Sequence, residues 1–257
     1  MKKIFVILGI MIWCNNVYAD CLSNIRYGTT CRTWKPGVEN NCGNGCTYTY
    51  DEETKTINVT TTGENTMISG SAFRPIAYEN NTIPTTDNIV INGVIKLSSN
   101  VFNNSTVSIS GADGTLVLTG VGHHAFGVGV TLDGNVVIPA NATFDSLAFH
   151  GVTLADGAKI YCAVENCAQK MIDSCQAYTG SESRGCLNYV NSFILDSEKF
   201  EQAPEGCDFW SNKGCSKCTN SNYSLEYGYC YRKRYTLPEA DAATSDDNEN
   251  MIEWIFE

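Results

Sequence analysis

The chain is short of positive charge and has no cysteine across its middle. Its 17 lysines and arginines stand against 28 aspartates and glutamates, which leaves a net charge of −11. Nucleic acids and anionic membrane surfaces are bound through clustered basic residues, so this balance argues against both classes of partner. We therefore expect no nucleic-acid partner.

Recognisable catalytic motifs are also missing. The sequence has no G-x-S-x-G, no P-loop and no dinucleotide-binding fingerprint, and its only histidines are His123, His124 and His150. No HExxH or similar spacing of metal ligands occurs. The sequence thus predicts a protein that is not an enzyme and has no catalytic residue, no cofactor and no metal ion.

No long apolar run occurs after the first 19 residues. Two lysines precede the apolar stretch 4–13, and Val17-Tyr18-Ala19 has the form of a signal-peptidase cleavage site. This stretch is too short to cross a membrane. Residues 1–19 are therefore predicted to be a signal peptide, with no transmembrane span, of a protein that is secreted or held at the cell surface, the periplasm being a further destination.

Cysteine is confined to the two flanks of the chain. Apart from Cys14 in the predicted signal peptide, twelve cysteines remain, an even number that predicts a disulfide framework in an exported protein. They are Cys21, Cys31, Cys42 and Cys46 near the start, and Cys162, Cys167, Cys175, Cys186, Cys207, Cys215, Cys218 and Cys230 in the last third. Because the middle has none, we predict six disulfides and no bridge between the two groups.

The pair Cys215-Ser-Lys-Cys218 also has the spacing of a zinc or redox motif. A zinc ribbon needs a second close pair, and a thioredoxin-like motif needs a βαβ context. Neither is found in the sequence, so disulfides are the favoured interpretation.

The cysteine-free middle contains one six-residue pattern four times: an apolar residue, three variable residues, Ala or Val, and Phe. The first and last residues of the copies are Ile68 and Phe73, Leu97 and Phe102, Val121 and Phe126, and Phe144 and Phe149. A repeated supersecondary unit buries its apolar face against its neighbours. These eight residues are therefore predicted to form the core of the repeats, with the phenylalanines stacked in one internal ladder.

Between the copies lie short apolar runs such as 130–132 and 136–138, rich in Val, Ile and Thr, which are typical of strands. An Asn-Gly or Asp-Gly pair separates the runs of each repeat and indicates a turn in which glycine takes positive φ. We predict a mainly β protein whose middle is a β-solenoid. The alternative is an antiparallel sandwich in which the same turns close hairpins.

Val136-Val-Ile-Pro139 followed by Ala148-Phe149 resembles the IP…AF signature of the BspA-type leucine-rich repeats of bacterial surface proteins. The stretch 42–51 running into 56–59 is similar to the cysteine-and-hairpin lead-in that often precedes such repeats. The resemblance covers about residues 42 to 160. It implies a leucine-rich-repeat-like β-solenoid and a role in contact with host surfaces or matrix.

Three parts are predicted: the signal peptide 1–19, a cysteine lead-in with the repeat β-solenoid at 20–160, and a disulfide-rich module at 161–257. Residues 215–230 loosely resemble small extracellular EGF- or furin-like modules.

The last stretch of the chain has two further patterns. Thr236-Leu-Pro-Glu239 has the capping-box form that opens a helix. Ile252, Trp254 and Phe256 stand at every second position, with the charged Glu253 between the first two and Glu257 after the last, as in a half-buried strand. We therefore expect a C-terminal helix and strand within the disulfide-rich module.

His123 and His124 occupy variable positions of the third copy, so we expect them to face solvent and to bind no metal. Taken together, the patterns predict an exported, non-enzymatic repeat protein that binds an extracellular or envelope macromolecule through adhesion or recognition. The alternatives are a structural spacer of the envelope and, third, a secreted hydrolase with an unrecognised site. A binding protein is expected to expose aromatic side chains on one face of the solenoid, whereas a spacer is not.

Overall fold

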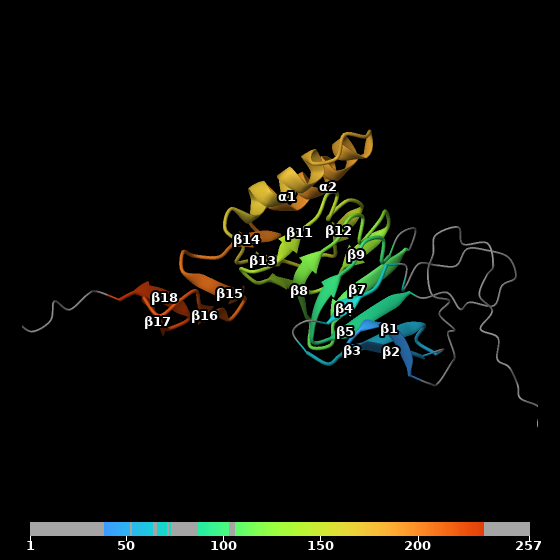
Figure 1. Cartoon of the computed structure of the whole chain (residues 1–257), viewed down its shortest axis with the longest axis horizontal. Coiled ribbons are helices and arrows are strands. Elements are labelled where there is room, and N and C mark those ends of the chain that lie inside the picture. The colour runs from blue at the N-terminus through green and yellow to red at the C-terminus, as the bar shows by residue number, and fades with distance from the viewer. Residues whose placement is uncertain are drawn as a thin grey trace, which may run out of the picture.

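The computed structural model describes residues 39–51, 53–63, 66–70, 72, 87–102 and 106–233. Over these residues the protein is mainly β, with one large curled sheet, a pair of helices and two small hairpins (Figure 1). The predicted mainly β class is thereby confirmed. The predicted features outside the described residues are the signal peptide 1–19, Cys21, Cys31, Phe73, the helix at 236–239 and the strand at 252–256.

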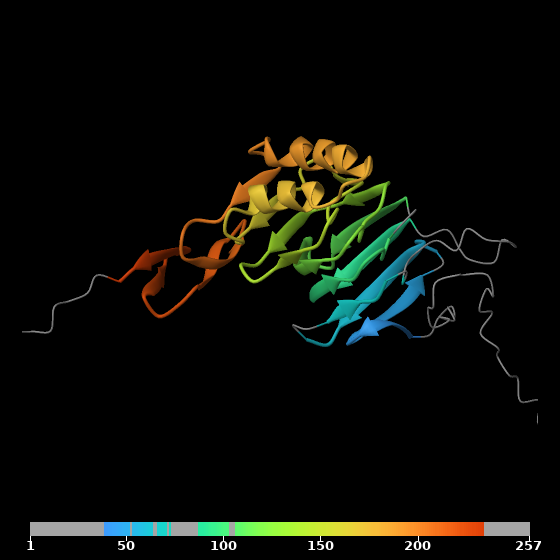
Figure 2. The ribbon, with the colours of Figure 1, turned by 45° about the horizontal axis from the view of Figure 1, so that its top comes forward.

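The sheet begins with an antiparallel lead-in. Its strands are β1 (Asn40–Asn44), β2 (Cys46–Asp51), β3 (Thr56–Thr61) and β4 (Met67–Ile68). Tyr48 and Tyr50 on β2 and Ile57 and Val59 on β3 alternate with more exposed residues and are buried on one face. This lead-in closes one end of the hydrophobic core (Figure 2).

Two parallel ladders continue from the lead-in. The ladder beside β3 consists of β5 (Asn88–Asn92), β7 (Val107–Gly111), β9 (Val130–Leu132) and β12 (Val152–Leu154). The ladder beside β4 consists of β6 (Val94–Leu97), β8 (Thr115–Val121), β10 (Asn135–Ile138), β13 (Ile160–Cys162) and β14 (Phe200–Gln202), with β11 (Thr143–Phe144) paired to β8. Each repeat thus adds one strand to each ladder, and the lead-in joins both ladders into one sheet.

An Asn-Gly or Asp-Gly turn connects the two strands of each repeat. Its glycines, Gly93, Gly114, Gly134 and Gly157, all have positive φ, from 78° to 111°. At Gly134 a Cβ atom would lie 2.7 Å from the carbonyl oxygen of Gly114, so successive turns approach too closely for a side chain. Among the described strands, the two that flank each turn pair in different ladders, so the turns do not close the hairpins of an antiparallel sandwich.

The six-residue pattern forms the turn at the other end of each repeat. The residue before Ala or Val is left-handed in three copies, with φ of 57° at Asn100, 52° at His124 and 57° at Leu147. Left-handed backbone costs an L-residue roughly 1–2 kcal/mol, so the neighbouring structure must hold this turn. Hydrogen bonds between repeats help to hold the turn in this conformation. The Asn100 N–H, for example, donates to the His123 carbonyl oxygen at 2.9 Å.

The first residues of the four copies are neighbours in the parallel ladder. Ile68 pairs with Leu97, Leu97 with Val121, and Val121 with Phe144. The first three are fully buried, whereas Phe144 is partly buried and packs against the same core. Register between repeats is therefore set at this position.

The last residues of the copies form a row of rings inside the sheet. The ring centroids of Phe102 and Phe126, and those of Phe126 and Phe149, are 6.1 Å apart and the rings are stacked. All three side chains are completely buried. Phe149 also contacts Phe193 at 6.3 Å, so the row continues into the helices that follow the repeats.

Two helices, α1 (Cys167–Gln176) and α2 (Glu182–Ile194), lie where no helix was predicted and cover the last repeats (Figure 1). Their buried residues recur at helical spacing: Cys167, Met171 and Cys175 in α1, and Cys186, Val190 and Phe193 in α2. Cysteine is as readily buried as an apolar residue, so counting it as apolar reveals this period. Within the described part of the chain, no helix has the length and apolar character needed to cross a membrane.

Beyond β14 the chain forms two antiparallel hairpins. Their strands are β15 (Cys207–Ser211), β16 (Gly214–Cys218), β17 (Tyr223–Glu226) and β18 (Tyr229–Arg232). The first hairpin is tied to the large sheet, since the Ala140 N–H donates to the Asp208 carbonyl oxygen and Trp210 Nε1 donates to Glu201 Oε1. Trp210 is buried with its own small group of apolar residues.

Disulfide bonds are confirmed on both flanks. The described bridges are Cys42–Cys46, Cys162–Cys167, Cys175–Cys186, Cys207–Cys215 and Cys218–Cys230. Each of these five joins cysteines of the same flank. Among the described cysteines, no bridge links the two groups, and the predicted total of six stays a prediction.

We expect Phe126→Ala to lower the free energy of unfolding by about 3–5 kcal/mol, because it removes the middle ring of the row and leaves a cavity. Urea unfolding followed by circular dichroism measures this loss. Val128→Ala is the matched control, since Val128 is 56 % exposed in the same segment and its truncation should change stability by less than about 0.5 kcal/mol. Equal, small effects of both substitutions would contradict a buried row.

Candidate functional site

His123, His124 and His150 lie next to one another in what we call the histidine row, where the repeats meet the helices. The ring centroids of His123 and His124 are 5.0 Å apart, and those of His124 and His150 are 4.7 Å apart. His150 is 7 % exposed and the His124 side chain 13 % exposed. His123 and His124 are half-buried and do not simply face solvent as expected, because Tyr178, which precedes α2, lies against His123 and Glu182 of α2 binds His124.

His123 joins two successive repeats. Its Nδ1 lies 2.9 Å from the carbonyl oxygen of Ser146 and 2.8 Å from the Ser146 Oγ. A carbonyl oxygen only accepts hydrogen bonds, so the first contact places the proton on Nδ1. In that tautomer Nδ1 has no lone pair for the serine proton and does not act as a general base toward Ser146.

His124 joins the repeats to α2. Its Nε2 lies 3.1 Å from Oε2 of Glu182, the first residue of that helix. An ionised carboxylate only accepts hydrogen bonds, so Nε2 donates here. An acidic side chain in the first turn is also favoured by the helix dipole. Glu182 therefore stabilises both the helix and its docking on the repeats.

His150 is the most buried of the three histidines, and it contacts Tyr189 of α2 edge-to-face at 5.8 Å. Its Nδ1 is buried and has no hydrogen-bond partner among the described residues. Burial lowers the pKa of His150 below its ordinary value of 6.5, His124 lowers it further, and Glu182 partly offsets the two effects. The neutral imidazole is thus the form that this packing favours.

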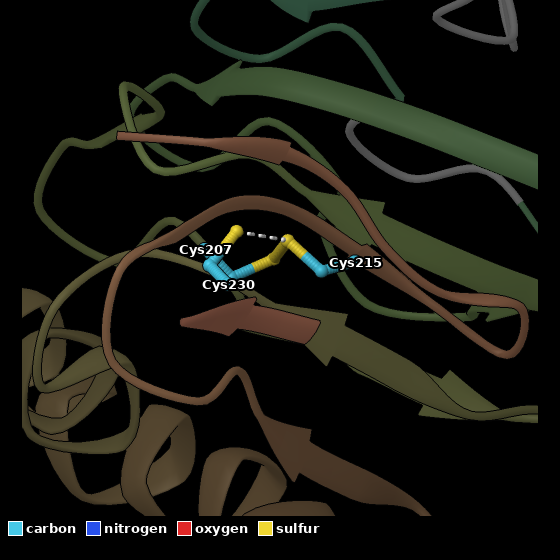
Figure 3. A group of neighbouring side chains, drawn as sticks. All are labelled: Cys207, Cys215 and Cys230. Atoms are coloured by element: carbon cyan, nitrogen blue, oxygen red, sulfur yellow. Dashed lines mark hydrogen bonds between the residues drawn. A yellow bond between two sulfur atoms is a disulfide. The ribbon is translucent and has the colours of Figure 1, made fainter. Parts of the chain in front are cut away.

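Among the described residues, three metal-type ligand atoms come within 4.8 Å of one another at one place, the Sγ atoms of Cys207, Cys215 and Cys230 (Figure 3). Cys207 is bonded to Cys215, and Cys230 to Cys218. The metal ligand is a thiolate, so these bridged sulfurs are not ready to bind an ion. The cluster instead brings two disulfides into contact, with the Cys215 and Cys230 sulfurs 3.3 Å apart.

The β17–β18 hairpin carries an exposed surface that we call the tyrosine face, formed by Tyr227, Tyr229 and Tyr231. Their exposed fractions are 96 %, 48 % and 50 %. Tyr229 and Tyr231 alternate along β18 and share one side of the hairpin with their register partners Glu226 and Ser224. The Tyr229 ring also lies against the buried Trp210, with the ring centroids 5.8 Å apart, so about half of the Tyr229 side chain remains exposed beside Tyr231.

The repeats themselves expose little apolar surface. Across the described residues of the repeats, Val128 is the one large apolar side chain that is exposed. The described repeats therefore do not show the aromatic face expected on the solenoid of a binding protein, and this outcome is the one expected of a spacer. An aromatic face lies on the β17–β18 hairpin instead. The sequence contains the alternating tyrosines 227, 229 and 231 that form this face. Alternation alone, however, does not tell which side of a strand is covered.

We expect the stability of the protein to fall as the pH drops below about 6.5, because the pKa of His150 is lower in the folded than in the unfolded state. Below 6.5 the unfolded state binds more protons, which favours unfolding until the folded-state pKa is passed. His150→Phe keeps a ring of similar size and cannot titrate, so this variant should lose less stability between pH 7.5 and pH 5.5, as measured by urea unfolding.

Val152→Ala serves as a control for general destabilisation, since Val152 is completely buried close to His150 in the chain. This variant should be less stable at both pH values and keep the pH dependence of the parent protein. Identical pH dependence of the parent and His150→Phe would show that His150 does not contribute.

No protein-family model matches the chain, and no curated protein or solved structure matches it. The geometry of the described residues is therefore what bears on function.

Proposed function

We propose that the protein is an exported, non-enzymatic repeat protein that binds an extracellular or envelope macromolecule. The observation that carries this proposal is the tyrosine face. Exposed apolar patches rimmed by polar groups are typical of interaction sites. Tyrosine suits such a site, because its ring buries a large area at low cost in conformational entropy and its hydroxyl forms hydrogen bonds.

Two features support export. The five described disulfides are typical of an oxidising compartment. The pattern of residues 1–19, with lysines, an apolar stretch and Val17-Tyr18-Ala19, is that of a signal peptide. The net charge of −11 supports a partner other than nucleic acid.

We also propose that the repeats are coils of a leucine-rich-repeat-like β-solenoid of the BspA type. In-register parallel pairing of successive copies and a left-handed residue in three of the six-residue turns support this architecture. A solenoid of this kind would hold the tyrosine face away from the lead-in, at the other end of the described chain.

A hydrolase is the weaker alternative. Within the described part of the chain, the serine–histidine contact is that of Ser146 with His123, and the tautomer required by the Ser146 carbonyl oxygen leaves His123 without a base function there. The contact is better explained as a link between repeats.

Binding of the protein to immobilised extracellular-matrix and envelope-polysaccharide preparations tests the proposal. The triple variant Tyr227→Ser, Tyr229→Ser, Tyr231→Ser should bind at least roughly 30-fold more weakly, because hot-spot residues contribute about 2 kcal/mol or more. Leu195→Ser is the matched control, since Leu195 is 81 % exposed and lies outside the hairpin.

The control should bind like the parent protein. Unchanged binding of the triple variant would refute the tyrosine face as the site. No binding by the parent protein to any of the preparations would favour the structural spacer instead.

A further inference from the structure

The two disulfides of the C-terminal hairpins touch each other. Cys207–Cys215 lies within the first hairpin, and Cys218–Cys230 links the two hairpins. In Figure 3 a dashed line joins the Cys215 and Cys230 sulfurs, which are 3.3 Å apart. For the other described disulfides, no third sulfur comes as close as 4.8 Å to both bridged sulfurs.

A second pairing of the same four cysteines fits the same backbone. Cys207 and Cys218 are directly opposite each other in the β15–β16 ladder. Opposed residues of an antiparallel pair have Cα atoms about 4.5–5.5 Å apart, which lies within the range of about 4.4–6.8 Å that disulfides span. Cys215 and Cys230 are already in sulfur contact, and the Cys215 N–H donates to the Gly228 carbonyl oxygen close to Cys230.

The two disulfides differ in access. Cys207 and Cys215 are 3 % and 4 % exposed, whereas Cys218 and Cys230 are partly exposed. A thiol from solution therefore reaches the Cys218–Cys230 bridge first. When the thiol bonds to Cys218, the Cys230 sulfur that it releases has the Cys215 sulfur of the buried bridge 3.3 Å away.

We propose that Cys207, Cys215, Cys218 and Cys230 form a thiol–disulfide exchange site for small thiols, at which two disulfide pairings interconvert. This site does not depend on the proposed binding function. Its chemistry needs a thiolate from solution as catalyst and no net oxidant or reductant, because two disulfides are present before and after the exchange.

The exchange proceeds in three displacements. The external thiolate bonds to Cys218 Sγ, the Cys218–Cys230 bond breaks, and its electron pair goes to Cys230. The Cys230 thiolate then bonds to the neighbouring Cys215 Sγ and expels Cys207 as thiolate. Cys207 finally bonds to Cys218 Sγ and returns the external thiolate to solution. The products are Cys207–Cys218 and Cys215–Cys230.

Trypsin distinguishes the two pairings, because Lys199, Lys213, Lys217 and Arg232 separate the cysteines into peptides 200–213, 214–217 and 218–232. In the pairing described here, 200–213 is linked to 214–217, and 218–232 holds an internal bridge. After exchange, all three peptides are linked in one species. The native protein is incubated with reduced glutathione, blocked with N-ethylmaleimide, digested without reduction and analysed by mass spectrometry.

We expect the three-peptide species to appear in the glutathione sample and not in a parallel sample without thiol. The buried Cys175–Cys186 bridge is an internal control and should remain unchanged. The Cys218→Ser, Cys230→Ser variant should keep Cys207–Cys215 and form no three-peptide species. If the three-peptide species is absent from the parent protein, the proposal is overturned. This holds whether glutathione forms a mixed disulfide at Cys218 or Cys230 or does not react at all. It does not depend on how the variant folds.

Discussion

Register between successive repeats is the constraint on which the rest of the structure depends. A single repeat cannot bury Phe126, because one side of the ring is covered by Phe102 and the other by Phe149. The rings stack only if each six-residue turn has the same shape, and that shape includes a left-handed residue such as His124. Backbone hydrogen bonds between repeats offset the cost of this conformation, so backbone pairing and ring burial support each other.

A stack of this kind must be closed at both ends, since its last rings would otherwise face water. The lead-in hairpin closes one end with alternating buried residues of β2 and β3. At the other end Phe193 of α2 packs on Phe149. The histidine row lies at this second junction, where Glu182 binds His124 and Tyr189 contacts His150. The imidazole of His150 is therefore buried at the junction that closes the stack.

The C-terminal hairpins are stabilised in a different way from the repeats. Their core is small, with Trp210 and cysteines as its main members, so disulfides supply the stability that burial does not. The chain is thus free to expose Tyr227, Tyr229 and Tyr231 there without disturbing the stack. The buried rings that stabilise the repeats and the exposed tyrosines of the hairpin are thereby separated along the chain.

Local patterns in the sequence were enough to predict the mainly β class, the places of the repeat strands and the glycine turns, because these follow from residue spacing and backbone preference. It also carried the helical period of α1 and α2, which is visible once cysteine is counted as apolar. No local pattern predicts that His150 lies beside His124, since twenty-five intervening residues must complete a repeat before the two rings meet. The same holds for the contact of Cys215 with Cys230 and for the hydrogen bond between His123 and Ser146. Long-range packing, and not local sequence, selects which of these side chains become neighbours.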